Sequence, residues 1–423
     1  MSTVQNKKVV VIGQGYVGLP VAMRAVEVGY SVVGIDVDKR RIDNLTNAQS
    51  YVGDISNEEL GEALRSGRYI ASLDYADAAD FDIAVITVPT PLRESVPDLT
   101  YIEESARSLS AHLKVGATVV LESTTYPGTT EELLVPILEK GSGLSSSSDF
   151  YVGYSPERID PGNKKWGFVE TPKVVSGLNE ASLEHVQDFY GSIVDTTVPV
   201  SSPKEAELAK LLENTFRHVN IALVNELAIF GNQLGVNVWE AIEAASSKPF
   251  GFMKFTPGPG VGGHCLPVDP SYLSWQVRRR LGQNFRFVEL ANDINDHMPD
   301  YVLQRLMMML NRDKVALFGS RILLIGLAYK KNSSDIRESP SLRLIELLQE
   351  AGAEVLAVDN HVEDYRWPTD VARLQFDRAA LESAHAAVLI TDHDDLDYSL
   401  FESTPTPVLD TRNMLKGAQV EVL

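Results

Sequence analysis

Short apolar runs alternate with helix-like segments along the N-terminal part of the chain. A β-branched run at 9–12 precedes a helix-like stretch at 19–28, and a second apolar run follows at 31–35. The alternation continues with apolar runs at 82–88 and 117–121. Strands separated by helices indicate a parallel, doubly wound sheet. The first part of the chain is therefore predicted to be an α/β domain.

The pattern changes to helices in the middle of the chain. Ser202 and Pro203 suit the cap and the first position of a helix, and apolar positions recur from there to Gly235, which predicts one long helix. A Gly- and Pro-rich stretch at 248–270 then separates two helical regions. Such a long irregular segment inside a domain predicts a functional loop. The Ser- and Gly-rich segment 141–149 is predicted to be a loose surface loop.

The C-terminal part repeats the opening pattern. An apolar run at 321–325 ends at Gly326, a helix-like run covers 341–350, and a further strand-like run covers 352–359. This second unit lacks the full set of glycines described below, so a different ligand role is predicted for it. The predicted fold is α/β, with two Rossmann-like doubly wound domains joined by a central helical region. The predicted boundaries are 1–199, 200–312 and 313–423.

Composition and charge exclude several classes of protein. The chain has 423 residues with 58 acidic and 38 basic side chains, a formal net charge of -20, so general nucleic-acid binding is not expected. No apolar run approaches the ~20 residues needed to span a bilayer, and no membrane association is expected. A single Cys excludes an intramolecular disulfide and a Cys-rich metal site and favours a reducing, cytoplasmic setting. No metal site is predicted.

Three glycines follow the first strand with the spacing of a dinucleotide-binding turn. Gly13, Gly15 and Gly18 form G-x-G-x-x-G between a predicted strand and a predicted helix, where they permit a tight turn and close approach of a pyrophosphate. Asp36 ends the second strand, where a carboxylate can bind a ribose and disfavour a 2'-phosphate, so NAD is favoured over NADP. The alternative to a dinucleotide site is a plain tight turn, with Asp36 exposed to solvent at the strand end. Arg41 could contact adenine or phosphate, or lie on a solvated helix face.

The only Cys of the chain lies in the predicted functional loop. A lone Cys is usually a small buried hydrophobic residue, but Cys265 stands in "GPGVGGHCLPVDP", beside glycines and close to Asp269. Such a loop can present a thiol next to groups that stabilise an anion, as covalent catalysis requires. His264 is interpreted as a loop residue rather than as a base.

Two polar residues interrupt the apolar pattern of the long helix. Lys210 and Asn214 are four positions apart and project from one helix face. A Lys and an Asn within an apolar helix are costly unless they meet a partner or a ligand. The alternative is an amphipathic surface stripe that also includes Glu207 and Glu213.

Charged residues also follow two predicted strands. Glu157 in "SPERIDPG" follows a strand end and could act as a base, or form a salt bridge with Arg158. Lys330, Lys331 and Arg337 follow the first strand of the C-terminal unit, at the edge where α/β domains bind ligands. This cluster suggests phosphate recognition, with a solvated basic turn as the alternative.

Six ordered segments together give the chain a specific resemblance. "VIGQGYVGLP", "VPTP", "SPERIDPG", "KLLENTFR", "GPGVGGHCLPVDP" and "GLAYKKNSSDIRESPS" resemble the UDP-glucose/GDP-mannose dehydrogenase family over nearly the whole chain. The resemblance implies NAD-dependent, four-electron oxidation of the C6 hydroxyl of a UDP-sugar to a carboxylate. It also implies an N-terminal NAD-binding domain, a central dimerisation and catalytic region, a C-terminal UDP-sugar-binding domain and a homodimer.

The resemblance implies roles for individual residues. Cys265 corresponds to the thiol that forms a thiohemiacetal and then a thioester, Glu157 to the carboxylate of thioester hydrolysis, and Thr124 to a hydroxyl near the catalytic water. The implied proton-handling and oxyanion-stabilising group is Lys210 and Asp269 with Asn214. The implied cofactor contacts are Gly13, Gly15, Tyr16, Val17, Gly18, Asp36, Arg41, Pro89, Thr90, Thr124 and Arg337. The implied substrate contacts are Glu157, Arg158, Lys210, Asn214, Gly260, Gly262, Tyr329, Lys330 and Arg412.

Departures from the UDP-glucose branch of the family bear on the substrate. This chain has "EST" with Glu122 where that branch tends to have "KST", "GGHC" with His264 for "GGSC", and Phe250 before Gly251 in place of an arginine motif. These variants look most like the branch that oxidises UDP-N-acetylglucosamine for surface polysaccharides. UDP-glucose and UDP-N-acetylmannosamine are the alternative substrates. A non-catalytic NAD or nucleotide-sugar sensor is the alternative from another class.

Overall fold

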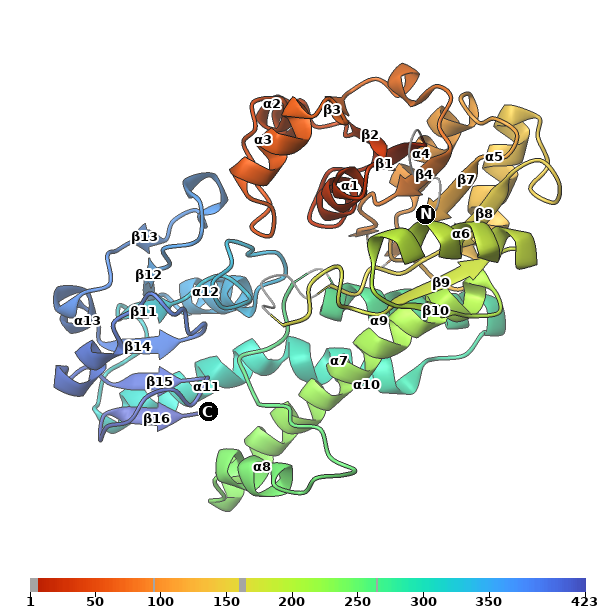
Figure 1. Cartoon of the computed structure of the whole chain (residues 1–423). Coiled ribbons are helices and arrows are strands. Elements are labelled where there is room, and N and C mark those ends of the chain that lie inside the picture. Colours follow the sequence, from red (N-terminus) through yellow and green to blue (C-terminus); the bar gives the residue numbers. More distant parts are fainter. Residues whose placement is uncertain (1–6, 94–95, 160–164, 264) are drawn as a thin grey trace. The chain divides into compact units, whose positions relative to one another are not determined.

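The chain forms two compact units in the computed structural model, Met1–Glu213 and Asn214–Leu423. The structure describes residues 7–93, 96–159, 165–263 and 265–423, and Figure 1 shows their helices and strands. Each unit contains its own sheet covered by helices, mainly parallel in the first unit and fully parallel in the second. The division of the chain at 199/200 and 312/313 stays a prediction.

The first unit is built on an eight-stranded sheet with the order β10-β9-β8-β7-β4-β1-β2-β3. The strands are β1 (Lys8–Ile12), β2 (Ser31–Ile35), β3 (Tyr69–Ser72), β4 (Ile83–Ile86), β7 (Thr118–Leu121), β8 (Tyr151–Tyr154), β9 (Lys173–Gly177) and β10 (Thr197–Pro199). Neighbouring strands are parallel except β8 and β9, which pair antiparallel. A small antiparallel pair, β5 (Leu92–Arg93) and β6 (Val96–Pro97), lies outside this sheet.

Helices cover both faces of the first sheet. They are α1 (Gly18–Glu27), α2 (Lys39–Thr46), α3 (Asn57–Arg65), α4 (Thr100–Ser110), α5 (Val135–Ser142) and α6 (Glu180–Ile193), with single turns at Tyr75–Ala78 and Thr130–Leu134. Val9 and Val11 of β1 pack with α1, α2, α3 and α6 on one face. Val10 and Ile12 pack with α4 and α5 on the other. This alternation along one buried strand is what a doubly wound sheet requires.

The second unit is built on a fully parallel six-stranded sheet with the order β13-β12-β11-β14-β15-β16. Its strands are β11 (Arg321–Ile325), β12 (Glu354–Val358), β13 (Ala372–Arg373), β14 (Ala386–Leu389), β15 (Val408–Asp410) and β16 (Val420–Val422). Helices α11 (Met298–Arg312) and α12 (Pro340–Glu350) share a core with one face, and α13 (Arg378–Ser383) packs on the other. Short turns occupy Asp364–Arg366 and Tyr398–Ser403.

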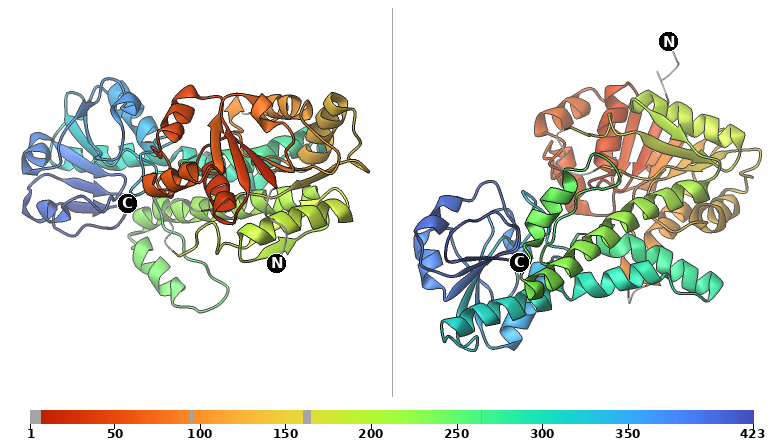
Figure 2. Two further views of the ribbon diagram at one scale, coloured as in Figure 1. Left: turned by 45° about the horizontal axis from the view of Figure 1, so that its top comes forward. Right: turned by 90° about the horizontal axis from the view of Figure 1, so that it is seen from below.

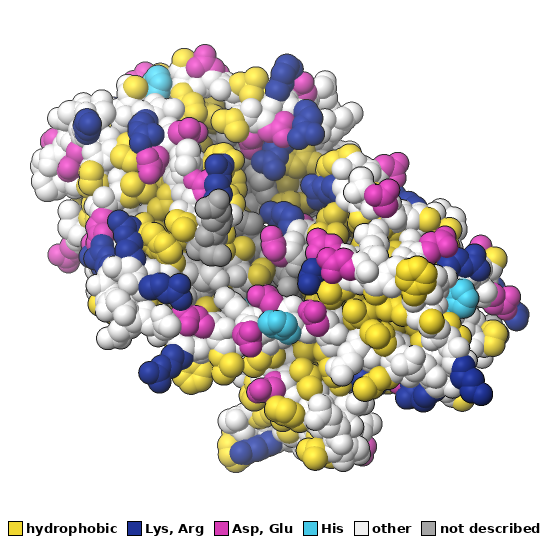
Figure 3. All heavy atoms as spheres, turned by 180° about the vertical axis from the view of Figure 1, so that it is seen from behind, with side chains coloured by type: hydrophobic (Ala, Val, Ile, Leu, Met, Phe, Trp, Pro, Cys, Tyr) yellow, Lys and Arg dark blue, Asp and Glu magenta, His cyan; other side chains and the backbone are white. Residues whose placement is uncertain are grey.

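The helical middle is dominated by one element. Helix α7 (Pro203–Leu234) is 32 residues long and is continuous in both views of Figure 2. It is followed by α8 (Val238–Ser246), α9 (Cys265–Leu281) and α10 (Arg286–Asp296). No helix among the described residues has the length and hydropathy of a membrane span. On the face drawn in Figure 3, Lys and Arg side chains lie among Asp and Glu side chains.

Two of the predicted loops are partly helical. The segment predicted as a loop over 248–270 ends earlier, because α9 begins at Cys265 and contains Pro270. Pro267 is the third residue of α9. The helix tolerates a proline there because the N–H groups of a first turn have no partner within the helix. The segment predicted as a loose loop at 141–149 begins with the last turn of α5, which extends to Ser142. The rest of it is hydrogen-bonded, since the Oε1 atom of Glu139 accepts from the N–H of Ser146 at 2.9 Å.

Candidate functional site

The glycine turn after β1 has the close contacts that the motif predicts. Gly13 has a φ of +92°, and a Cβ atom on Gly18 would lie 1.8 Å from the carbonyl oxygen of Gly13. A Cβ atom on Gly15 would meet only the Nη1 atom of Arg41, at 3.9 Å. The first and third glycines are therefore required by packing, whereas the space beside Gly15 is open. An open backbone at the N-terminus of α1 fits a pyrophosphate.

Asp36 lies beside this turn, at the end of β2. Its Oδ2 atom accepts hydrogen bonds from the N–H of Gln14 at 2.8 Å and from Nη1 of Arg41 at 3.1 Å. Arg41 also lies over the ring of Tyr51, 5.8 Å from its centroid. The arginine thus contacts the carboxylate that is predicted to bind ribose. Tyr16 and Val17 lie between the second and third glycines of the motif, where Tyr16 is exposed and Val17 is half-buried.

The ends of β4 and β7 meet next to each other in this sheet. The hydroxyl of Thr90 donates a hydrogen bond of 2.8 Å to the carbonyl oxygen of Thr124. Thr90 is buried, Thr124 is half-buried and Pro89 is exposed. The two predicted cofactor-binding loops, after β4 and after β7, are therefore joined at the carboxyl edge of the sheet, where doubly wound domains bind ligands.

Glu157 belongs to a buried group of charges in the first unit. The Nζ atom of Lys173 forms an ion pair with Glu122 and lies 3.2 Å from Oε2 of Glu157. The hydroxyl of Tyr190 donates to Oε2 of Glu122 at 2.7 Å. Lys210 from α7 donates to the main-chain oxygen of Glu157. Lys210 thus contacts the main chain of Glu157, and both side chains are buried.

The charges of this group shift one another's pKa. Burial raises the pKa of Glu122 to about 7, although Lys173 opposes the shift. Burial would also raise the pKa of Glu157, but the charge of Lys173 and hydrogen bonds from Glu122 and the N–H of Ile159 hold it below its ordinary value. Glu157 therefore ionises at a lower pH than Glu122.

Two alternatives from the sequence are settled by contacts in the first unit. The guanidinium of Arg158 pairs with Glu213 at 2.7 Å, so the proposed salt bridge between Arg158 and Glu157 does not form. Glu207 does not belong to a surface stripe. It is fully buried, and its carboxylate accepts hydrogen bonds from the N–H groups of Gly128 and Thr130.

The second unit contains the remaining predicted catalytic residues. The Nδ2 group of Asn214 on α7 donates a hydrogen bond of 2.6 Å to Oδ2 of Asp269 on α9. Both residues are buried. Cys265 is the first residue of α9. His264 lies outside the described residues.

The loop that leads to Cys265 packs closely on the segment after β11. A Cβ atom on Gly262 would lie 2.6 Å from Cβ of Tyr329, and one on Gly260 would lie 3.1 Å from Cγ of Pro340. The N–H of Gly263 donates to the main-chain oxygen of Arg337 at 2.9 Å. Glycine is therefore needed here for close packing of two loops.

The predicted basic cluster of the second unit is largely paired with acids. Arg337 forms an ion pair with Asp335 at 2.6 Å, and Lys331 forms one with Asp394 at 2.6 Å. Lys330 is half-buried. The guanidinium of Arg412 donates to the main-chain oxygen of Ile390 at 2.6 Å. The pairing of Arg337 matches the alternative of a basic turn balanced by acids.

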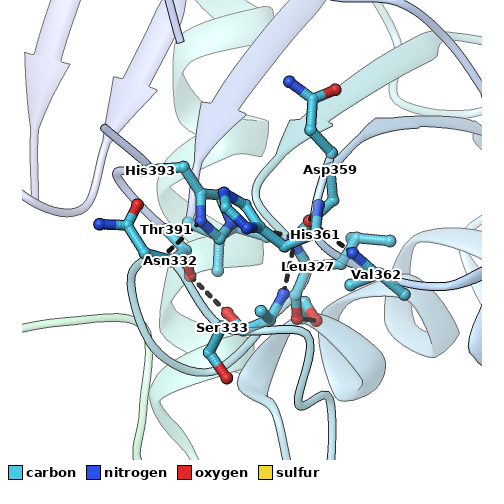
Figure 4. A network of polar contacts seen from close by, with 12 residues as sticks. Leu327, Asn332, Ser333, Asp359, His361, Val362, Thr391 and His393 are labelled. Carbon is cyan, nitrogen blue, oxygen red and sulfur yellow. Dashed lines mark hydrogen bonds and ion pairs between the residues drawn. The ribbon is translucent and has the colours of Figure 1, made fainter. Parts of the chain in front are cut away.

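A buried histidine network supports the same edge of the second sheet (Figure 4). The Nε2 atom of His393 lies 3.1 Å from Oδ2 of Asp359, and its Nδ1 atom accepts from the N–H of Asn332 at 3.0 Å. His361 stacks on His393 and pairs with Asp395 at 3.0 Å. His361, His393 and Asp395 are close enough to hold a metal ion. Both nitrogens of His393 are engaged in hydrogen bonds, however, so the network as it stands fixes the loops of this edge.

These features define the class of the protein before any comparison. A glycine turn and an acidic strand end in a doubly wound sheet form a dinucleotide-binding domain, which is typical of NAD-dependent oxidoreductases. Three family models match consecutive parts of the chain. They are the NAD-binding, central and UDP-binding domains of the UDP-glucose/GDP-mannose dehydrogenase family, over residues 7–194, 204–297 and 323–417.

Individual relatives and solved structures agree with these models. A UDP-N-acetyl-D-mannosamine dehydrogenase of Methanococcus maripaludis is 34% identical over 97% of this chain and 93% of its own. A UDP-N-acetyl-D-glucosamine 6-dehydrogenase of Salmonella typhi is 40% identical over 85% of this chain and 83% of its own. The structure of the Pyrococcus horikoshii UDP-D-ManNAc dehydrogenase matches with a TM-score of 0.88 at 33% identity, over 98% of both chains.

The chain belongs to the UDP-glucose/GDP-mannose dehydrogenase family. It is an NAD-dependent UDP-sugar 6-dehydrogenase, and its predicted fold and cofactor are confirmed. Sequence reasoning missed Lys173 and Tyr190, which surround Glu157 and Glu122. The available signal was a Lys at the start of a strand that is otherwise apolar.

Proposed function

We propose that the protein oxidises the C6 hydroxyl of UDP-N-acetyl-D-glucosamine to a carboxylate. The observation that supports this substrate is the 40% identity to the Salmonella typhi relative, together with the "EST" and "GGHC" variants in the sequence of this chain. The product would be an acidic sugar nucleotide for a surface polysaccharide. The predicted cytoplasmic location is part of the same proposal.

In the proposed reaction, Cys265 holds the sugar between two oxidations. When bound, NAD would supply the hydride acceptor for both oxidations at C6. The sulfur of Cys265 adds to the C6 aldehyde to give a thiohemiacetal, and the second oxidation converts this adduct to a thioester. Water then attacks the C6 carbonyl carbon, the bond from that carbon to sulfur breaks, and Glu157 takes a proton from the water.

The remaining candidate residues would bind the UDP-sugar and the cofactor and stabilise the oxyanion that forms at C6. Lys210 and Asp269 would handle protons and stabilise the oxyanion at C6, and Asn214 would orient Asp269 through its hydrogen bond. Thr124 would lie near the attacking water. The UDP-sugar would contact Arg158, Gly260, Gly262, Tyr329, Lys330 and Arg412. The glycine turn, with Asp36, Arg41, Pro89, Thr90 and Arg337, would bind the cofactor.

A specific observation favours a second substrate, UDP-N-acetyl-D-mannosamine. The Methanococcus maripaludis and Pyrococcus horikoshii dehydrogenases named for that sugar match 97% and 98% of this chain. NADH formation by the purified protein, with each of the two sugars and with UDP-glucose, decides between them. Two NADH per UDP-N-acetyl-D-glucosamine, with little turnover of the others, is the expected result.

Replacement of the nucleophile tests the chemistry separately from the substrate. Cys265→Ser should abolish the release of two NADH per sugar because it removes the thiol that forms the thioester. Unchanged NADH formation by Cys265→Ser would rule out the covalent mechanism. If the wild-type protein turns over none of the UDP-sugars, the alternative of a non-catalytic NAD or nucleotide-sugar sensor is favoured.

A homodimer is also proposed. Large apolar side chains of α7 are exposed in the second unit, namely Phe216, Leu223, Leu227, Phe230 and Leu234. An exposed apolar face of this size on one helix is typical of an interface. Light scattering should give the mass of two chains, and Leu227→Glu should lower it toward that of one chain.

A further inference from the structure

Three charged side chains from three neighbouring strands meet in the interior of the first unit. Glu122 follows β7, Glu157 follows β8 and Lys173 begins β9, and their residues are 1%, 9% and 3% exposed. The Nζ atom of Lys173 contacts the carboxylates of both Glu122 and Glu157. Buried charges are costly, and breaking such a group is more costly than never forming it. A group of this kind beneath a candidate catalytic carboxylate calls for a functional explanation.

We propose that Glu122 and Lys173 are positioning residues for Glu157, which orient and tune its carboxylate as the base that releases the sugar from Cys265. The inference rests on the proposed function, because it assumes a thioester on Cys265. Neither Glu122 nor Lys173 is assigned a contact with substrate or cofactor. Both act through Glu157.

The orientation of Glu157 is fixed from both sides of its carboxylate. Its Oε1 atom accepts from the N–H groups of Arg158 at 2.6 Å and Ile159 at 2.5 Å. Its Oε2 atom faces Lys173 at 3.2 Å. These contacts hold the carboxylate in one place and stabilise its charged form.

The ammonium of Lys173 is held in turn by its surroundings. The rings of Phe168 and Tyr190 lie 5.6 and 5.3 Å from it, within the range of cation–π attraction. Tyr190 also donates to Glu122. Of the neighbouring cations, Lys210 donates to the main-chain oxygen of Glu157, and its charge adds a smaller lowering of the pKa of Glu157 than that of Lys173. The guanidinium of Arg158 pairs with Glu213. Lys173 is therefore the cation that faces both carboxylates.

A single buried ammonium balances the charge of only one carboxylate, so one of the two carboxyl groups is expected to keep its proton near neutral pH. The two carboxyl groups share the ammonium of Lys173, and the charge of Glu157 contributes to the raised pKa of Glu122. Burial raises the pKa of Glu122 to about 7, whereas Glu157 is ionised at lower pH. Glu122 thus carries the proton below neutral pH, and its ionisation above neutral pH adds a like charge beside Glu157. That added charge makes Glu157 a stronger base.

The step concerned is hydrolysis of the thioester. A bond forms from the water oxygen to the C6 carbonyl carbon, the carbon–sulfur bond breaks, and sulfur leaves as the thiolate. Glu157 accepts one proton of the water, and no oxidant or reductant takes part. A stronger base at Glu157 should therefore speed loss of the adduct from Cys265.

The decay of the adduct on Cys265 is measured directly. The full-length protein is mixed with NAD and whichever UDP-sugar yields two NADH, quenched in acid at successive times, and weighed as intact protein across pH 5 to 9. The wild-type decay rate should rise in two steps, one from Glu157 at low pH and one of about three-fold near pH 7 from Glu122.

Two variants should change this profile in different ways. Glu122→Gln keeps the size of the side chain but cannot ionise, so it should lose the step near pH 7 and keep the lower one. Lys173→Gln removes the cation, so the lower step should move up by about one pH unit or more. Ser176→Ala is the matched control. Ser176 is buried on the same strand β9 and donates to the main-chain oxygen of Tyr154, so its loss should leave both steps in place.

Each outcome has a distinct meaning. A Glu122→Gln profile that superimposes on the wild type, or a Ser176→Ala profile that changes in the same way as Glu122→Gln, overturns the inference alone. If Lys173→Gln does not fold, the nearly isosteric Glu122→Gln still decides. If the wild-type protein forms no adduct on Cys265, the proposed function fails, and the inference fails with it.

Discussion

Asp36 and Asp359 occupy the same position in the two sheets, but only the carboxylate of Asp359 has all its acceptor sites occupied by hydrogen bonds from within the protein. Each follows the second strand of its sheet and accepts from the N–H after a first-strand glycine, Gln14 at 2.8 Å and Leu327 at 2.7 Å. Asp36 accepts two further hydrogen bonds, from the N–H of Asp38 and from Arg41. Asp359 accepts four more, from Ala328, His361, Val362 and His393. Asp359 therefore has no acceptor capacity left for a ribose, which explains why similar folds serve different ligands.

The two aspartates should respond differently to the same substitution. Asp359→Asn removes a charge that holds four N–H groups and His393, and it should lower the free energy of unfolding by about 3 kcal/mol. Asp36→Asn should instead weaken NAD binding by about tenfold, or ~1.4 kcal/mol, and reduce discrimination against NADP. Urea unfolding and titration with each cofactor measure both effects. Equal losses of stability in the two variants would contradict this assignment.

The pH dependence of the Asp359 effect has a definite sign. Burial would raise the pKa of Asp359, but His393 and the N–H groups of Ala328 and Leu327 hold it well below its ordinary value. The stability that this carboxylate contributes is therefore present above the ordinary pKa of an aspartate, ~3.9, and is lost as the pH falls toward its lower folded value. The gap between wild type and Asp359→Asn should be constant from pH 6 to 8 and narrow in acid.

Substitution of two glycines of the same motif by Ala should have different effects, one on stability and one on cofactor binding. Gly18→Ala places Cβ 1.8 Å from a main-chain oxygen, so the turn must shift, at a cost of about 3 kcal/mol or more. Gly15→Ala meets only the end of the Arg41 side chain, so it should fold normally but obstruct the pyrophosphate. Thermal unfolding separates the two variants, and NADH titration should show weakened binding for Gly15→Ala. A Gly18→Ala protein as stable as the wild type would contradict the packing argument.

The hydrogen bond from Asn214 to Asp269 is expected to matter for turnover. Asn214→Ala leaves the buried carboxylate of Asp269 without this donor, which should cost about 1–3 kcal/mol of stability and lower kcat. Asn220→Ala is the control, since Asn220 lies on the same helix and its Nδ2 group bonds to the oxygen of Phe216 on the exposed side. If the two variants have equal kcat in their folded fractions, Asn214 has only a structural role.

Local patterns were sufficient to predict most of the fold. The strand predicted at 31–35 is β2, the strand predicted at 321–325 is β11, and the helix predicted between Ser202 and Gly235 is α7, Pro203–Leu234. These elements have strong periodicity or clear end signals, and tertiary contacts reinforce what the local residues prefer.

Elements whose signals conflict were harder to predict. The start of α9 at Cys265 lies among glycines and prolines, which favour a loop locally. The antiparallel pairing of β9 with β8 has no local signal, because a buried strand reads the same in either direction. In both cases packing within the sheet or helix layer outweighs local preference.

The contacts within the candidate site were harder still to predict from the sequence. The motif residues of the first unit come together at the sheet edge as expected, but the partners of Glu157 do not follow from its motif. Lys173 reaches Glu122 across 51 positions of the chain, and a Lys is rarely buried unless such a partner exists. Spacing rules reveal neighbours on one helix or strand, whereas ion pairs between strands require the tertiary structure.

Glu207 connects the long helix to the turn that follows Thr124, and its stability contribution should depend on pH. Burial raises its pKa to about 7, although the hydroxyl and N–H of Thr130 and the N–H of Gly128 oppose the shift. Between pH 4.5, the ordinary value, and about 7 the unfolded chain has released this proton while the folded chain retains it. The wild-type free energy of unfolding therefore falls as the pH rises through this range.

Glu207→Gln has no proton to release at this position. The free energy of unfolding of the variant, minus that of the wild type, should increase by roughly 3 kcal/mol from pH 4.5 to 7 and stay constant above pH 7.5. Glu205→Gln is the control on the same helix, because the hydrogen bond from Ser202 lowers the pKa of that exposed carboxyl. Its difference from the wild type should be flat above pH 5. A flat difference for Glu207→Gln as well would mean that Glu207 is ionised throughout, held by the N–H groups of the turn more strongly than burial opposes it.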